Sequence, residues 1–185
     1  MPMLEDRNEL FRRAGWITLL TLATILGSFV FACATPFAAL AALAALFLPR
    51  RDAFVLIGIN WLANQMIGYG FLHYPQTWDS FAWGAAIGIA ALVATEAGLG
   101  GESLGRRFGL ASAAVMTFAI SFAAYEFALF AATAVLPVGG GFAPAVMLYV
   151  LEVNGVAFAG LLILQGLGRS LGLACSRGMG APSPA

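Results

Sequence analysis

Residues 12–51 read RRAGWITLLTLATILGSFVFACATPFAALAALAALFLPRR, an apolar run with an arginine pair at each end and a proline at position 36. A single kinked helix over this run would place arginines on both sides of a membrane, whereas positive charge is normally retained on the cytoplasmic side. The residue before a proline also avoids the α-helical region. We therefore expect a helical hairpin, with one span over Ala14–Ala34, an outer turn at Ala34–Pro36 and a short second span over Phe37–Leu48.

The other arginines continue this alternation. Arginine occurs only before the first apolar stretch, after the last and in every second connector, at positions 7, 12, 13, 50, 51, 106, 107, 169 and 177. The pattern predicts four further spans, over Ala53–Leu72, Phe81–Leu99, Phe108–Leu136 and Pro144–Gly168. The expected fold class is therefore an all-α, polytopic membrane protein with six transmembrane helices and both termini inside.

Two local signals set the expected ends of the fourth span. Asp79 or Ser80 can cap its start by accepting a hydrogen bond from a free N–H group of the first turn. Gly100 and Gly101 are expected to end it.

The composition agrees with a membrane protein. Of the 185 residues, 61% are apolar and 10% are charged, whereas a soluble domain carries about 25% charged residues. Six spans of about 20 residues each leave no room for a folded soluble domain. We expect a cytoplasmic segment over 1–13, a transmembrane domain over 14–169 and a disordered cytoplasmic tail over 170–185, in a bacterial inner membrane.

The chain lacks the phosphate-binding and metal-binding motifs of soluble enzymes. It has no P-loop and no HExxH. One histidine and two cysteines, Cys33 and Cys175 on opposite sides of the membrane, do not make a closed zinc site. The arginines are spread along one membrane face and do not form a nucleic-acid-binding patch. We therefore expect no enzymatic activity, no cofactor, no metal and no nucleic-acid partner.

Acidic residues within spans are costly and mark candidate sites. At about 1.5 Å per residue, Glu126 and Glu152 both lie roughly 12–15 Å below the outer ends of neighbouring antiparallel spans, so they can share one polar pocket. Two close carboxylates do not both ionise cheaply, which would suit a proton relay. The alternative is that each is neutral and hydrogen-bonded to a neighbour. Glu96, near the inner end of its span, is expected to reach the inner headgroups or to pair with Arg106 or Arg107.

Polar amides gather on the third span. Asn60 and Asn64 share a helical face, and Gln65 follows them. They are expected to hydrogen-bond to other helices, with Asn154 and the Thr117–Ser121–Tyr125 stripe as candidate partners. The loop after this span is rich in aromatic and ionisable residues, which either form a membrane-interface belt or bind a ligand.

Small residues recur at four-residue spacing, for example at Gly84 and Gly88 and at Ala23 and Gly27. Such spacing lets helix backbones approach closely in lipid, where burial itself does not drive association. It serves packing within the chain or the docking of a membrane partner.

The chain resembles the substrate-binding S-components of energy-coupling-factor vitamin transporters, including the solitary proteobacterial cobalamin transporters. The resemblance covers nearly the whole length and is carried by the architecture and by the segments at 31–37, 61–65 and 73–75. It implies an outward-facing vitamin cavity under the outer loops, and an energising membrane partner or ATPase module docked at Ala23, Gly27 and Ala38. His73 would be a stand-in for the cobalt-coordinating side chain known in part of that family.

These observations predict a membrane transporter, or a substrate-binding membrane subunit, for a small organic nutrient of the vitamin class. The expected ligand-binding residues are His73, Tyr74, Trp78 and Asp79 in the outer loop, with Asn64, Gln65, Tyr125, Glu126, Tyr149 and Glu152 below them. Two alternatives remain open: a proton- or cation-coupled carrier that uses Glu126 and Glu152, and a non-transporting scaffold or assembly subunit.

Overall fold

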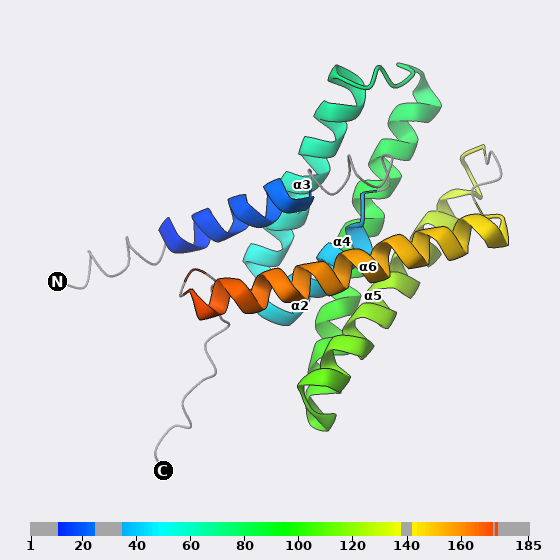
Figure 1. Cartoon of the computed structure of the whole chain (residues 1–185). Coiled ribbons are helices and arrows are strands. Elements are labelled where there is room, and N and C mark those ends of the chain that lie inside the picture. Colours follow the sequence, from blue (N-terminus) through cyan, green and yellow to red (C-terminus); the bar gives the residue numbers. More distant parts are fainter. Residues whose placement is uncertain (1–10, 25–34, 138–141, 172, 174–185) are drawn as a thin grey trace, which may run out of the picture.

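The computed structural model describes residues 11–24, 35–137, 142–171 and 173, and every regular element in these ranges is a helix. The expected all-α class is therefore confirmed for this part of the chain. A first helix covers 11–24, and the following elements are α2 (Phe37–Phe47), α3 (Arg50–Gly70), α4 (Trp78–Gly105), the 3-10 turn η1 (Arg106–Phe108), α5 (Leu110–Ala132) and α6 (Pro144–Ser170) (Figure 1). The expected turn at 34–36 lies only partly within the described residues.

Three helices are long and apolar enough to cross a membrane: Trp78–Phe108, Leu110–Ala132 and Pro144–Ser170. Length and hydropathy therefore indicate a helical membrane protein. α3 is not among the three. Its 21 residues form a helix about 31 Å long, which is close to the roughly 30 Å thickness of the hydrocarbon core. Its amides, including Asn60 and Asn64, lower its hydropathy.

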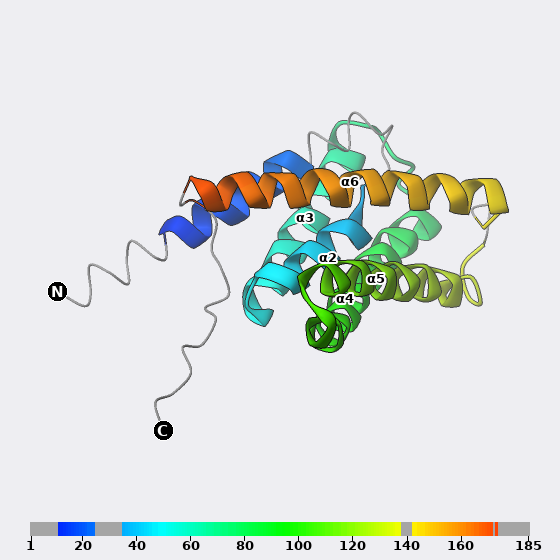
Figure 2. The same ribbon diagram turned by 60° about the horizontal axis from the view of Figure 1, so that its bottom comes forward.

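α2 lies at the centre of the bundle. All 11 of its residues are buried, and it contacts α3, α4, α5 and α6. Figure 2 shows α2 between α6 and the α4–α5 pair. An 11-residue helix is about 16 Å long, roughly half the hydrocarbon thickness. The expected second span is therefore an enclosed half-length helix, and its alanines let four neighbours approach its backbone.

A helix that ends inside the protein must have its free backbone groups satisfied by other elements. At the start of α2, Pro36 offers no side-chain cap. Instead the Ala39 N–H donates to Asn154 Oδ1 of α6, at 3.1 Å. At the other end, Arg106 Nη2 donates to the Leu46 carbonyl, at 3.4 Å. Both ends of the central helix are therefore capped by residues from distant parts of the sequence.

The described arginines cluster at one end of the bundle, which we call the arginine end. Arg13 lies 3.8 Å from Asp52 at the start of α3, and Arg169 lies over the Phe47 ring at 5.1 Å from its centroid. Together with Arg106 on Leu46, these contacts join the first helix, α2, α3, η1 and α6. The C-terminal end of α2 carries partial negative charge, which favours nearby cations.

The ion-pair partner of Glu96 differs from the one predicted from the sequence. Its carboxylate pairs with Arg50 of α3, at 2.9 Å, and not with Arg106 or Arg107. Arg106 instead pairs with Glu102, one turn before it on α4. The reason is the antiparallel packing of α3 and α4, which brings the first residue of α3 beside the last third of α4.

Glycines bring α4 and α5 into close contact. A side chain at Gly101 would lie 3.2 Å from the Thr117 Cα atom, and one at Gly105 would lie 3.0 Å from the Ala113 nitrogen. The prediction that Gly100 and Gly101 end this helix is wrong, since α4 continues to Gly105. Gly101 serves close packing and not termination, because its missing side chain leaves room for α5.

Candidate functional site

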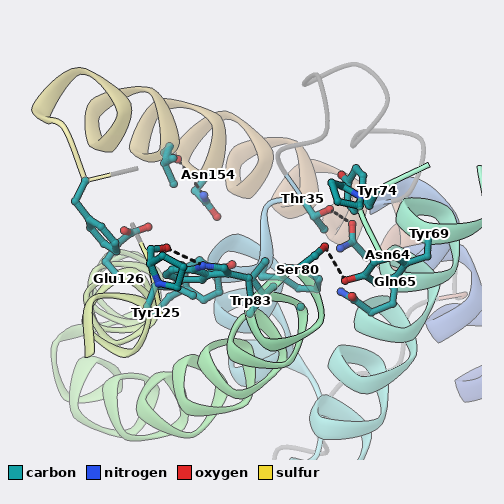
Figure 3. A pocket seen from close by; sticks show the side chains of 18 residues that line it. Thr35, Asn64, Gln65, Tyr69, Tyr74, Ser80, Trp83, Tyr125, Glu126 and Asn154 are labelled. Carbon is teal, nitrogen blue, oxygen red and sulfur yellow. Dashed lines mark hydrogen bonds between the residues drawn. The ribbon is translucent and has the colours of Figure 1, made fainter. Parts of the chain in front are cut away.

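A cavity of about 610 Å³ opens at the end of the bundle opposite the arginine end. It lies over the start of α2, between the second half of α3, the first half of α4, the last third of α5 and the first half of α6 (Figure 3). The residues that line it are aromatic, amide, hydroxyl and aliphatic, with one carboxylate: Thr35, Phe37, Asn64, Gln65, Tyr69, Tyr74, Pro75, Ser80, Trp83, Gly84, Ile87, Tyr125, Glu126, Leu129, Pro137, Phe142, Val150 and Asn154.

The turn after α3 places Tyr74 against the cavity. His73 adopts a left-handed backbone conformation, with φ of 54°, which non-glycine residues adopt only in a few per cent of cases. The chain thereby folds back, and the Tyr74 N–H donates to the Gly68 carbonyl at 3.0 Å. The Tyr74 ring then covers Gly68, where a Cβ atom would lie 2.6 Å from the ring. Gly68 therefore makes the space that Tyr74 occupies.

Tyr69 connects this turn to α4. Its ring stacks on Phe81 with centroids 4.7 Å apart and meets the Tyr74 ring edge-on at 6.0 Å. Its hydroxyl is hydrogen-bonded to the Ser80 hydroxyl at 3.1 Å. Ser80 is thus engaged with α3. Neither Asp79 nor Ser80 is the N-cap residue of α4, because the helix begins at Trp78 and its N-cap is Thr77. Asp79 lies in the first turn, where its carboxylate interacts with the backbone N–H groups of Asp79 and Ser80.

The amides of α3 form one wall. Asn64 Oδ1 accepts a hydrogen bond from the Thr35 hydroxyl at 2.6 Å, and Gln65 lies against Gly84 of α4. Interhelical hydrogen bonding is confirmed for Asn60, whereas the partner of Asn64 lies just before α2, and the predicted partners are wrong. Asn60 donates to Thr21 in the first helix, at 3.2 Å, since α3 faces that helix and the start of α2 on this side.

α5 and α6 supply the opposite wall. Tyr125 is buried, with its ring centroid 6.5 Å from that of Phe37, and Glu126 reaches the cavity from the next position. Asn154 lines the cavity from α6. In Figure 3, Glu126 and Asn154 lie on one side of the cavity, Asn64, Gln65 and Ser80 lie on the other, and Trp83 lies between them. Trp83 is fixed by a 3.1 Å hydrogen bond from Nε1 to the Pro137 carbonyl.

The structure brings together five of the ten predicted ligand-binding residues: Asn64, Gln65, Tyr74, Tyr125 and Glu126. His73 and Asp79 are exposed and do not line the cavity, and neither does Trp78, which is 82% exposed. The loop turns these three side chains away while directing Tyr74 inward.

Glu152 and Tyr149 also lie outside the cavity on the exposed side of α6. The prediction that Glu126 and Glu152 share a pocket is therefore wrong. Residues two apart on a helix point about 200° apart at 3.6 residues per turn. Because Asn154 faces α2, Glu152 must face outward.

Of the predicted docking residues, Ala38 is fully buried in α2 and has no surface to offer a partner, which corrects that expectation. Ala23 is half-buried in the first helix. Gly27 lies outside the described residues.

Sequence reasoning missed several lining residues, including Thr35, Tyr69, Ser80, Trp83 and Phe142. Tyr69 had a usable signal, because it follows Gln65 by four positions and so lies on the same helical face. Asn154 was named only as a hydrogen-bond partner.

In chemical terms the cavity combines hydrogen-bonding amides and hydroxyls with aromatic faces and one acidic group. Among the described residues there is no cluster of histidine, cysteine and acidic side chains suited to a metal ion. No protein-family model, curated protein sequence or solved structure matches the chain.

Proposed function

We propose that this protein is a transporter, or the substrate-binding membrane subunit of one, that captures a small organic nutrient at the outer face of a bacterial inner membrane. In this proposal six helices enter the membrane, and the arginine end and both termini face the cytoplasm. The observation that carries the proposal is the cavity of about 610 Å³ at the end opposite the arginines. Pockets for small ligands typically enclose about 300–1,000 Å³ and carry a few polar groups on apolar walls.

The cavity narrows the expected nutrient class. A vitamin remains the leading candidate, since amides such as Asn64 and Gln65 recognise heteroatom-rich rings and the aromatic side chains stack on them. An intact cobalamin is larger than this volume, so the proposal favours a smaller vitamin. His73 lies outside the lining, which removes support for its proposed role as a cobalt ligand.

Release into the cytoplasm requires energy from outside the chain, because the sequence carries no phosphate-binding loop. We propose an energising membrane partner or an ATPase module, as the resemblance to S-components implies. A carrier that relays protons between Glu126 and Glu152 is disfavoured, since only Glu126 lines the cavity.

Purification from the native host followed by native mass spectrometry tests the proposal. We expect a bound organic molecule, and we expect Gly68→Ala to reduce its occupancy. The added methyl group would displace the Tyr74 ring from the cavity, and an aromatic contact contributes about 1 kcal/mol, or about fivefold in affinity.

Gly70→Ala is the matched control, because a Cβ at Gly70 meets no atom within 4 Å. This variant should retain the ligand at wild-type occupancy. Repeated preparations without any bound organic molecule would contradict the proposed function, as would equal occupancy in the Gly68→Ala protein.

A further inference from the structure

The charge of the cavity constrains its ligand. Among the described residues that line the cavity, Glu126 is the one that normally carries a full charge at neutral pH, and they include no arginine or histidine. The sequence contains no lysine. An unpaired carboxylate in a low-dielectric wall is unfavourable unless a cation or a proton neutralises it.

No described arginine can neutralise Glu126. The described arginines stand at the start of the first helix, the start of α3, the η1 turn and the end of α6, all at the arginine end. The ion pairs of this region join Arg13 to Asp52, Arg50 to Glu96 and Arg106 to Glu102. Asp52, Glu96 and Glu102 are thus paired with arginines at that end, whereas Glu126 faces the cavity at the other end.

The remaining walls suit a flat ring. Figure 3 shows Trp83 between Glu126 on one side and the Asn64–Gln65 pair on the other. Aromatic faces attract both stacked rings and cations. The amides at the far side offer both donors and acceptors to the edge of a ring.

On this basis we propose that the ligand is an elongated organic cation. Its amine or quaternary nitrogen lies at Glu126, its ring lies against Trp83, and a hydrogen-bonding edge meets Asn64 and Gln65. This inference rests on the proposed function, because it names the substrate class of the same cavity. The Glu126 charge disfavours anionic nutrients, because the described lining residues include no cation that offsets it.

Three indole compounds of similar size test the charge preference. Tryptamine is cationic at neutral pH, tryptophol is neutral and indole-3-acetate is anionic. Equilibrium binding is measured by titration calorimetry on protein in nanodiscs of zwitterionic lipid, so that lipid charge does not attract the cation. We expect tryptamine to bind about tenfold or more tightly than tryptophol, as for a hydrogen bond to a charged group, and indole-3-acetate to bind most weakly.

Glu126→Gln should abolish the preference of tryptamine over tryptophol. Glu152→Gln is the matched control, since this second glutamate is exposed on the outer side of α6, and it should retain the preference. Equal affinities of the wild-type protein for tryptamine and tryptophol overturn the inference, as does a preference that survives in Glu126→Gln.

The same titrations separate the two proposals. If tryptophol or indole-3-acetate binds best and Gly68→Ala weakens that binding, the cavity takes ligands but not cations, so the inference fails and the proposed function stands. If no compound binds and native preparations contain no ligand, both proposals fail.

Discussion

Gly105→Val is expected to destabilise the protein by about 3 kcal/mol, the upper end of the range for overpacking. A Cβ at this position would lie 3.0 Å from the Ala113 nitrogen and 3.1 Å from the Ser112 carbonyl oxygen. These are backbone atoms of α5, so no side-chain rotation can relieve the contact. The helices would have to separate, and the tightest helix pair of the bundle would loosen. Thermal unfolding in detergent, followed by circular dichroism, measures the change.

Gly100→Val provides the control for this prediction. It introduces the same side chain five positions earlier on α4, where a Cβ meets no atom within 4 Å. Its melting temperature should remain close to that of the wild-type protein. Similar losses in both variants would mean that helix propensity, and not contact with α5, determines the effect.

Asn154→Leu is expected to cost about 2–3 kcal/mol of stability, because a buried N–H group would lose its acceptor. Asn154 Oδ1 accepts from Ala39 in the first turn of α2, where a helix has no intrahelical partner for its N–H groups. Leucine matches the side chain in size but accepts no hydrogen bond. The start of α2 also forms the cavity floor through Phe37, so ligand occupancy should fall as well.

Glu152→Leu is the matched substitution on the exposed side of α6. It removes an acid from a surface that faces lipid in our account, and it should be neutral or stabilising in chemical denaturation with sodium dodecyl sulfate. A loss of stability at Glu152 equal to that at Asn154 would contradict the assigned orientation of α6.

The arginine pattern predicted that arginines from distant parts of the sequence would lie at one end of the bundle, because positive charge is retained on one side of a membrane. Residues such as Arg13, Arg50 and Arg169 are far apart in sequence, and yet their contacts lie at one end of the bundle. The helical class and the approximate helix ranges followed from hydropathy and length. Of the residues predicted in the α3–α4 connection, Tyr74 lines the cavity, whereas His73, Trp78 and Asp79 do not.

The rotation of each helix about its axis could not be predicted in the same way. In soluble helices, a polar stripe marks the solvent-facing side, whereas in α6 both faces are apolar and the inward stripe contains Asn154 and Gln165. Glu152 was taken as inward-facing because it is acidic. The contact of α6 with α2 decides which side of α6 faces inward, and hydropathy does not report that contact.

The role of α2 was also beyond sequence reasoning. Its run of alanine, leucine and phenylalanine has the hydropathy of a lipid-facing span, but small side chains fit equally well at the centre of a bundle. Its caps are supplied by Asn154 and Arg106, which are more than 50 positions away. Only the three-dimensional packing brings these partners together.

The cavity and the arginine end should face opposite sides of the membrane, and labelling of single cysteines measures this orientation. Gln76→Cys lies in the exposed loop beside the cavity and Arg51→Cys lies at the start of α3, each in a chain with Cys33 and Cys175 replaced by alanine. A membrane-impermeant maleimide applied to intact spheroplasts should modify the cysteine at 76 and should reach position 51 only after the membrane is opened. Modification of both positions from the same side would contradict the account.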